Sequence, residues 1–213
     1  MNTHSLLKRG KMARQNKPDK EELIRKAAIH AFARYGFHHT QVEEIARRAR
    51  VAVGTIYNYF TSKEEILLSI FEADFKERIR SYQRLRKSGL SIPEQIRTLL
   101  TEHFSLKAKS VDLVQVLLRE RLYPGKEFKE RLLEFYQEML KRIEELINEG
   151  VEQGWVRPCN PRIIALALLG VVESVNTCVM LYPPQKVEQI RKEAPVELVD
   201  FLWNGLKKEE TSA

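Results

Sequence analysis

The sequence predicts an all-α protein of about nine helices. Apolar residues recur at helical spacing through most of the 213 residues, and the sustained β-branched alternation of strands is missing. The chain holds only 9 Gly and 8 Pro, so few positions would interrupt a helix. With 43% hydrophobic residues it can bury a sizeable core, in one or two domains.

The chain opens with a basic segment that we expect to be a disordered arm. Residues 1–18 hold five basic side chains and no acidic one, and Pro18 stops regular structure. The arm is either an additional electrostatic grip on a nucleic acid, in a minor groove, or a chain start with no role of its own. The sequence leaves both interpretations open.

The first helix is expected to run from about Asp19 to Tyr35, where Gly36 fits the left-handed position that ends a helix. His38 and His39 follow it. Because adjacent side chains on a helix face different ways, these histidines are not expected to form a metal-binding pair.

The stretch from Thr40 to Lys63 is predicted to form two short helices joined by a tight turn at residues 50–53. Thr40 and Glu43 have the spacing of a capping box, which places the start of the first of these helices at Thr40. The inward-facing apolar positions of both helices follow helical spacing: Val42, Ile45, Ala46, Ala49, Ile56 and Phe60. The second helix therefore turns its polar side chains outward.

These outward groups suit DNA. Asn58 can pair with adenine through two hydrogen bonds, and Thr55 can offer its methyl group to thymine. The hydroxyls of Tyr57 and Tyr59 can donate to phosphates, and Gly54 leaves room for a phosphate at the helix start. An ordinary helical hairpin with solvated polar residues has the same spacing, so spacing alone does not decide.

The distribution of charge favours the nucleic-acid interpretation. The chain has 36 basic and 29 acidic side chains, a net charge of +7. Residues 1–60 hold 12 basic and 5 acidic side chains, which is the whole excess, because the remainder holds 24 of each sign. A solvated surface needs no such asymmetry, whereas a polyanion partner does.

Residues 19–65 resemble the N-terminal domain of TetR-family transcriptional regulators. The resemblance rests on the segments AFARYGF, HHTQVEEIARRA, VGTIYNYF and SKEEIL, which span residues 31–67 with short gaps. Two residues depart from the family pattern, Arg50 in place of Gly and Ala52 in place of Ser, so the second helix lacks its usual hydroxyl cap. They put the turn geometry in doubt, not the resemblance.

The resemblance implies a three-helix DNA-binding domain, a larger ligand-binding domain, and a homodimer on a palindromic operator in double-stranded DNA. The expected boundaries are a basic arm at 1–18, a helix-turn-helix domain at 19–61, a ligand-binding and dimerisation domain at 62–208, and a tail at 209–213. The candidate DNA-contacting residues are Thr40, Gln41, Val53, Gly54, Thr55, Tyr57, Asn58, Tyr59 and Lys63, the last resembling a family lysine that meets a phosphate.

The remaining helices follow from capping signals and apolar spacing. Ser62 with Glu65, and Ser91 with Glu94, have capping-box spacing. The fourth helix begins beside the DNA-binding residues and ends inside the larger domain, so it is the expected link between ligand and DNA. The expected helices are Ser62 to about Lys87, Ser91 to about Ala108, Val111–Leu122, Glu127–Gln153, one from Pro161 through residues 163–172, and about Val196–Lys207.

The last two of these helices are expected to hold two chains together. The apolar run 163–172 is shorter than the roughly 20 residues of a membrane span, so no membrane partner is expected. A helix that is apolar on all sides must be covered on all sides. With Leu198, Val199, Leu202 and Leu206 of the last helix, it would form a four-helix bundle with a second chain.

Three segments of the larger domain, at residues 103–106, 115–120 and 169–180, resemble the acyl-CoA-responsive fatty-acid-degradation repressors of Gram-positive bacteria. This resemblance implies an apolar tunnel for a long-chain acyl-CoA. The candidate ligand-contacting residues are Phe71, Phe75, Phe104, Leu117 and Val175 along the acyl chain, with Arg119, Arg121 or Lys107 at the CoA phosphates. Each also fits ordinary core or surface.

Two polar residues of the apolar helix need partners, Glu173 and Asn176. They either line a wet pocket or pair across the dimer, and the sequence does not decide between these. The operator, the regulated genes and the effector's chain length are likewise not given by the sequence.

The leading hypothesis is a cytoplasmic repressor of fatty-acid degradation genes, released from DNA by long-chain acyl-CoA. The alternatives are the same repressor tuned to a drug or other apolar molecule, a small helical enzyme, and a membrane-surface protein. No catalytic residue, cofactor or metal site is expected, because the five histidines lack ligand spacing and no Gly-rich phosphate loop occurs. Two cysteines are too few for a disulfide framework, as expected in a reducing compartment.

Overall fold

The computed structural model describes residues 19–104, 110–123, 125–179 and 181–207. These residues form helices joined by short connections, and no strand occurs among them, so the predicted all-α class is confirmed. The helices are α1 (Lys20–Tyr35), α2 (Val42–Ala49), α3 (Val53–Tyr57), α4 (Lys63–Arg86), α5 (Ile92–Phe104), α6 (Val111–Glu120), α7 (Lys126–Glu152), α8 (Pro161–Val179) and α9 (Pro184–Leu206).

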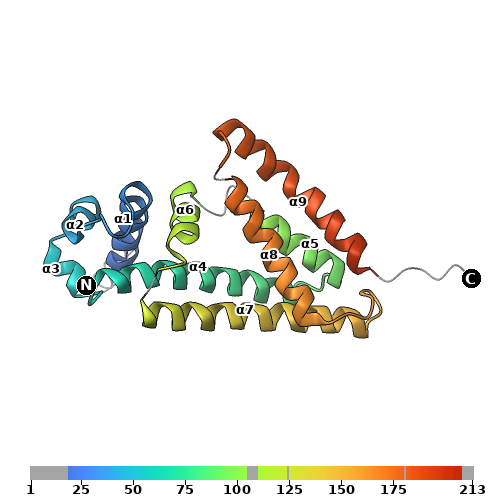
Figure 1. The fold of residues 1–213 in the computed structure, drawn as a ribbon. Helices are drawn as coiled ribbons and strands as arrows, with labels where there is room; N and C mark the ends of the chain where they lie inside the picture. Colours follow the sequence, from blue (N-terminus) through green and yellow to red (C-terminus); the bar gives the residue numbers. More distant parts are fainter. Residues whose placement is uncertain (1–18, 105–109, 124, 180, 208–213) are drawn as a thin grey trace, which may run out of the picture.

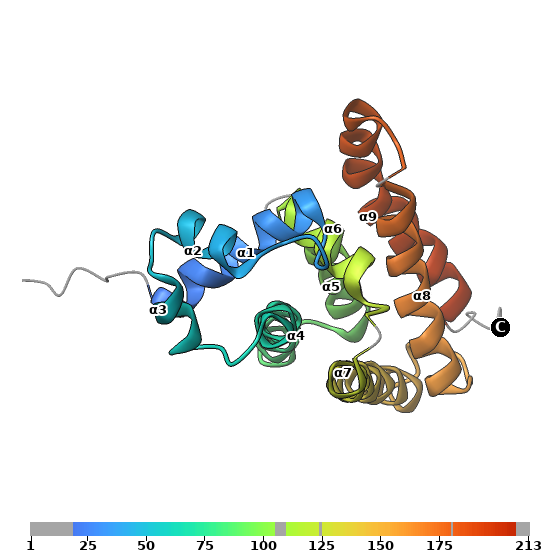
Figure 2. The ribbon, with the colours of Figure 1, turned by 60° about the vertical axis from the view of Figure 1, so that its left-hand side comes forward.

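The helices are arranged as a small head and a larger body joined by one long helix. The head is α1, α2 and α3, and the body is α5 to α9 (Figure 1). Helix α4 runs from the head into the body with α7 packed along it, while α8 and α9 lie at the end remote from the head. Helix α6 stands against α1, between the head and α8 (Figures 1 and 2).

The hydrophobic core of the head is continuous with that of the body. One cluster of buried residues includes Ile24, Phe32 and Ile45 of the head, Phe71 of α4 and Val116 of α6, and it extends into α7. Two further clusters join α5, α7, α8 and α9 at the far end. Because packed interiors transmit displacements, the head cannot shift without disturbing α4, α6 and α7.

Most of the predicted helix starts are confirmed by side chains that satisfy free backbone N–H groups. The Ser62 hydroxyl accepts from the backbone N–H of Glu65 at 3.1 Å. The Glu94 carboxylate accepts from the backbone N–H of Ser91 at 2.9 Å and from its hydroxyl at 2.7 Å. These contacts are the ones for which a Ser followed three residues later by Glu is suited.

The last helix is longer than predicted. Helix α9 begins at Pro184 rather than near Val196, and it continues through Pro195. A proline in a helix interior removes one backbone hydrogen bond, so Pro195 weakens the helix locally. Here Ala194 and Val199 on either side of Pro195 are buried, and their packing holds the chain in one continuous helix.

Candidate nucleic-acid interface

Helices α2 and α3 form the predicted hairpin, but α3 is shorter than expected. It ends at Tyr57, and Asn58 and Tyr59 lie in the turn that follows. The inward positions are as predicted, since Ile56 is 1% exposed and Phe60 is 4% exposed. The apolar spacing therefore fixed the orientation of this segment even though it overestimated the length of the helix.

The polar residues predicted to face outward are accessible. Tyr57 is 53% exposed and Tyr59 is 42% exposed. Gly54 and Asn58 are also exposed, while Thr55 is half-buried. All of these residues lie within residues 54–59, a short segment at the tip of the head, where α3 lies (Figure 2). Gln41 is exposed and Val53 is half-buried.

Thr40 has a different role from the one predicted. Its side chain is buried, and its hydroxyl donates to the carbonyl oxygen of Gly36 at 2.7 Å. The N-cap of α2 is Gln41, whose side chain makes no capping hydrogen bond, so the predicted capping box of Thr40 and Glu43 is wrong. The Thr40 hydroxyl closes the loop between α1 and α2 and does not point toward a DNA partner.

Lys63 is also engaged within the head. Its ammonium donates to the carbonyl oxygens of Phe37 and Thr40, each at 2.9 Å, and lies 4.5 Å from the centroid of the Phe37 ring. A third, longer hydrogen bond reaches the carbonyl of His38 at 3.4 Å. Lys63 therefore ties the start of α4 to the α1–α2 loop, and its expected phosphate contact stays a prediction.

The turn between α2 and α3 forms despite the two departures from the family pattern. Arg50 takes the left-handed conformation, with φ 56° and ψ 45°. For a residue with a Cβ atom this costs roughly 1–2 kcal/mol, which explains why glycine suits the position. Ala52 is the extended N-cap of α3 and makes no side-chain cap.

Helix α6 is clamped onto the C-terminal end of α1 by two adjacent charged residues. Arg119 donates to the carbonyl oxygens of Phe32 and Ala33, in the last turn of α1. Glu120 is 7% exposed and accepts from the backbone N–H of Phe37 at 3.2 Å and from Arg119 Nε at 2.8 Å. Carbonyls at the C-terminal end of a helix favour a cation. Arg119 supplies this cation to α1, and Glu120 supplies an acceptor to the backbone N–H of Phe37.

The guanidinium of Arg119 is bonded to α1 and to Glu120, and its expected contact with CoA phosphates stays a prediction. Arg121 is occupied as well, because it donates to the Glu173 carboxylate of α8 at 3.0 Å. The hydroxyl of Tyr136 on α7 donates to the other oxygen of Glu173 at 2.6 Å. Burial and this hydrogen bond raise the pKa of Tyr136 well above its ordinary value. Glu173 therefore has partners inside its own chain.

The apolar residues predicted to contact an acyl chain lie in two clusters. Phe71, Phe75 and Leu117 belong to the cluster shared by head and body, with Phe71 packed edge-on against Phe128 at 5.1 Å between ring centroids. Val175 packs in a cluster of α4, α5 and α7 to α9. The side chains of Phe104, Lys107 and Asn176 lie outside the described residues.

The two groups are connected through Tyr136. The ring of Phe75 lies 5.5 Å from that of Tyr136, whose hydroxyl reaches Glu173 on α8, two residues before Val175. A sequence search for titratable residues misses Tyr136 and Glu120, because each sits in an amphipathic helix where its spacing is that of ordinary core. Their partners come from other helices, so no local signal marks them.

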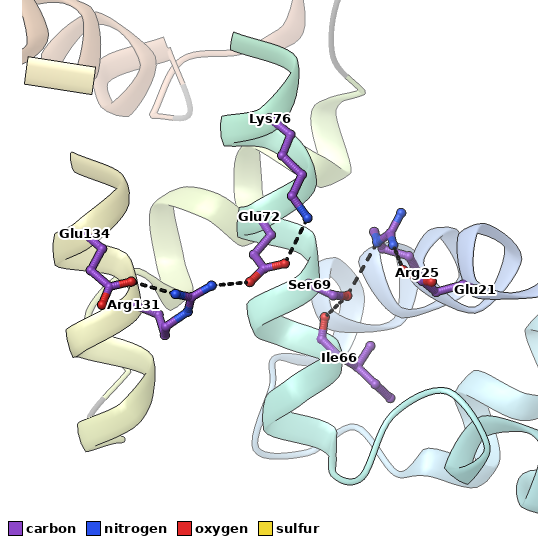
Figure 3. Close-up of polar contacts among 8 residues, drawn as sticks. All are labelled: Glu21, Arg25, Ile66, Ser69, Glu72, Lys76, Arg131 and Glu134. Atoms are coloured by element: carbon purple, nitrogen blue, oxygen red, sulfur yellow. Dashed lines mark hydrogen bonds and ion pairs between the residues drawn. The ribbon is translucent and has the colours of Figure 1, made fainter. Parts of the chain in front are cut away.

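Helix α4 is attached on both sides close to the head. Arg25 Nε of α1 donates to the Ser69 hydroxyl at 3.4 Å, and Arg131 of α7 pairs with Glu72 at 3.0 Å (Figure 3). Burial raises the pKa of Glu72, but its hydrogen bonds with Arg131 and Lys76 outweigh this and lower the pKa overall. The link predicted for α4 thus has contacts to α1 and α7 one turn apart.

Exposed apolar side chains gather on the last two helices. Ile163 and Leu166 of α8 are 59% and 48% exposed, and Val196 and Phe201 of α9 are 57% and 70% exposed.

Among the described segments, no helix has the length and apolar character that a membrane span requires. Among these residues, no group of three or more His, Cys, Asp or Glu side chains is arranged to hold a metal ion.

Comparison with known proteins gives matches over both parts of the chain. Residues 24–70 match the family described as bacterial regulatory proteins of the tetR family, and residues 89–177 match a tetracyclin repressor-like C-terminal domain. The fatty acid metabolism regulator protein of Bacillus subtilis (strain 168) is 30% identical over 169 residues, which is 78% of this chain and 87% of that protein.

Two solved structures share the fold at similar identity. The fatty acid degradation regulator FadR from Bacillus halodurans has a TM-score of 0.77 at 26% identity, covering 92% of this chain and 100% of that one. FadR from Bacillus subtilis, solved in complex with stearoyl-CoA, has a TM-score of 0.72 at 26% identity, covering 86% and 95%.

Replacement of Lys63 by methionine tests whether this residue is structural. We expect Lys63→Met to lower the free energy of unfolding by roughly 1–3 kcal/mol, because the partly buried carbonyls of Phe37 and Thr40 lose a charged donor. Thermal or urea unfolding of the full chain measures this. Lys76→Met is the matched control, since Lys76 is 65% exposed and pairs only with Glu72 of its own helix. Unchanged stability together with weaker DNA binding would restore a purely phosphate-contacting role.

Proposed function

Because the chain belongs to the TetR family and is a transcriptional regulator rather than an enzyme, we propose that it represses fatty-acid degradation genes until a long-chain acyl-CoA releases it from DNA. The observation that carries the proposal is that Gly54, Tyr57, Asn58 and Tyr59 are exposed on a head that is packed against the body. Hydroxyl, amide and backbone N–H groups on such a surface are suited to bases and phosphates in a major groove.

The DNA-bound form is proposed to be a homodimer joined through α8 and α9. The support is four apolar side chains that a single chain leaves exposed on these helices: Ile163, Leu166, Val196 and Phe201. Of the α9 residues expected from the sequence at this contact, Val199 and Leu206 are instead buried within the chain itself. Large exposed apolar patches are typical of protein interfaces. A two-fold dimer would place two heads on successive major grooves about 34–36 Å apart, which requires a palindromic operator.

The effector is proposed to be a long-chain acyl-CoA. The support is the stearoyl-CoA bound by the B. subtilis structure and the fatty-acid role in the name of the 30% identical relative. In this chain, Phe75, Phe135 and Tyr136 form an aromatic group between α4 and α7, next to the Glu173 carboxylate of α8. Apolar rings with polar atoms at one side suit an acyl chain that ends in a polar group.

Release is proposed to pass through α6 as well as α4. Residues 119–121 join three helices, because Arg119 and Glu120 hold the end of α1 while Arg121 holds Glu173 of α8. An effector that displaces α8 or α7 would therefore pull directly on the head. A ligand changes DNA affinity only if it favours one of two arrangements of the protein. The contacts of residues 119–121 physically connect α8 with the head, so a shift of one helix can favour one arrangement of the other.

The proposal is tested by selecting binding sites from a random-sequence duplex library with the full-length protein. The recovered sequences should be palindromic, and micromolar stearoyl-CoA should release them. Stearate alone and CoA alone serve as controls for the two halves of the effector. Release by unrelated apolar compounds but not by stearoyl-CoA would assign the protein to a drug-type effector instead.

Two substitutions should separate DNA binding from dimerisation. Tyr57→Ala should weaken binding to the selected duplex by roughly 1–3 kcal/mol while the protein remains a dimer, since Tyr57 lies on the head. Phe201→Glu should give a monomer with weak DNA binding, because it places a charge in the apolar seam. Sedimentation and duplex titration of both variants measure this, and a dimeric Phe201→Glu protein would place the seam elsewhere.

Glu173→Gln should reduce the effect of the effector on DNA affinity. Without the charge on Glu173, Arg121 holds α8 less firmly, so the coupling free energy should fall by roughly 0.5–2 kcal/mol. The measurement is duplex affinity with and without saturating stearoyl-CoA.

Glu144→Gln is the matched control, because Glu144 also joins α7 to α8 through an ion pair of 3.0 Å, with Arg162, but has no contact with α6. Equal loss of coupling in both variants would argue against a special path through α6.

A further inference from the structure

Arg50 is held in an unfavourable backbone conformation at the turn before α3. Within the described residues it is the one non-glycine residue with a positive φ, at 56°. The other positive-φ positions, Gly36, Gly89 and Gly154, are glycines, which adopt this region readily. Strained backbone at a non-glycine residue is concentrated at functional sites, so the side chain at this position needs an explanation.

The guanidinium of Arg50 is exposed and uncommitted. In the described part of the chain it has no hydrogen-bond or ion-pair partner, whereas its neighbours Arg47 and Arg48 both pair with Glu44. Hydrogen bonds from Arg47 and Arg48 lower the pKa of Glu44, which therefore stays ionised and holds both arginines. Arg47 and Arg48 thus share one carboxylate, whereas the donors of the Arg50 guanidinium stay free for an external partner.

The position of Arg50 places this charge beside the surface that α3 presents. Only two residues separate Arg50 from Val53, the first residue of α3, so their Cα atoms lie within about 11 Å. The exposed Gly54 follows directly. A duplex that received α3 in its major groove would bring the phosphates that flank the groove close to the end of α2.

We propose that Arg50 is a DNA-contacting residue whose guanidinium binds a backbone phosphate at the edge of the groove occupied by α3. Guanidinium and phosphate form paired, charge-assisted hydrogen bonds, and such a contact adds affinity without adding sequence preference. The strained turn is then the structural cost of presenting a cation where glycine would fit better. This inference rests on the proposed DNA-binding function and adds a residue to its contact surface.

The test compares three variants of the full-length protein, Arg50→Gly, Arg50→Ala and Arg50→Lys, in thermal unfolding and in duplex binding at 50 to 200 mM salt. Arg50→Gly relieves the backbone strain and should raise Tm by about 1–3 °C. Both Arg50→Gly and Arg50→Ala should flatten the slope of log K against log salt by about 0.9 per protomer, or about 1.8 for a dimer. Arg50→Lys keeps a cation and should retain most of the slope.

A second measurement identifies the contact directly. Ethylation of single phosphates in the selected duplex should reveal one phosphate per half-site whose neutralisation weakens the wild-type protein but not Arg50→Gly. Arg80→Ala removes a cation from the middle of α4, where the side chain is 65% exposed, and should leave the slope unchanged.

The outcomes separate this inference from the proposed function. A wild-type protein with no salt-dependent duplex binding would overturn the proposed function, and the role of Arg50 with it. Salt-dependent binding by the wild type with an unchanged slope and ethylation pattern in Arg50→Gly would overturn the role of Arg50 alone. A more stable but more weakly binding Arg50→Gly protein is the result that supports the proposal.

Discussion

The clamp of α6 on the end of α1 is the interaction on which the rest of the structure depends. Arg119 satisfies the last carbonyls of α1, and the buried Glu120 satisfies both Arg119 and the backbone N–H of Phe37. Removing Arg119 would leave the buried carboxylate of Glu120 without its charged partner, which is more costly than losing an ordinary hydrogen bond. Contacts with the body therefore set the position of the head, and with it the position of the exposed residues of α3.

Similar contacts recur along the chain, with a basic side chain from one segment donating to backbone carbonyls in a loop or helix end of another. Lys63 does this for the α1–α2 loop, and Arg157 does it for α9, donating to the carbonyl of Gly205 at 2.8 Å. Long basic side chains reach helix ends that no backbone group can serve. Part of the basic composition is consequently structural, and only those cations left unpaired on the surface contribute fully to an electrostatic surface for DNA.

The candidate site could be predicted from the sequence where it depends on the spacing of apolar residues. It could not be predicted where a side chain bonds to a partner that is distant in the chain. The inward positions of Ile56 and Phe60 and the exposure of Tyr57 and Tyr59 follow from helical spacing alone. Thr40 and Arg119 donate to backbone carbonyls of this chain, which their residue types suit as well as they suit a phosphate. Only the approach of α1 and the α1–α2 loop in space decides between the two.

By itself the sequence determined the helical class, most helix starts and which side of the α3 segment is exposed, because apolar spacing and capping residues act over a few residues. Tertiary structure alone decided that α9 continues through Pro195 and that Glu173 pairs with Arg121 and Tyr136. It also decided that Arg50 stands unpaired in a left-handed turn. The continuation of α9 and the pairing of Glu173 arise from contacts between helices far apart in the chain, which no local pattern of residues encodes.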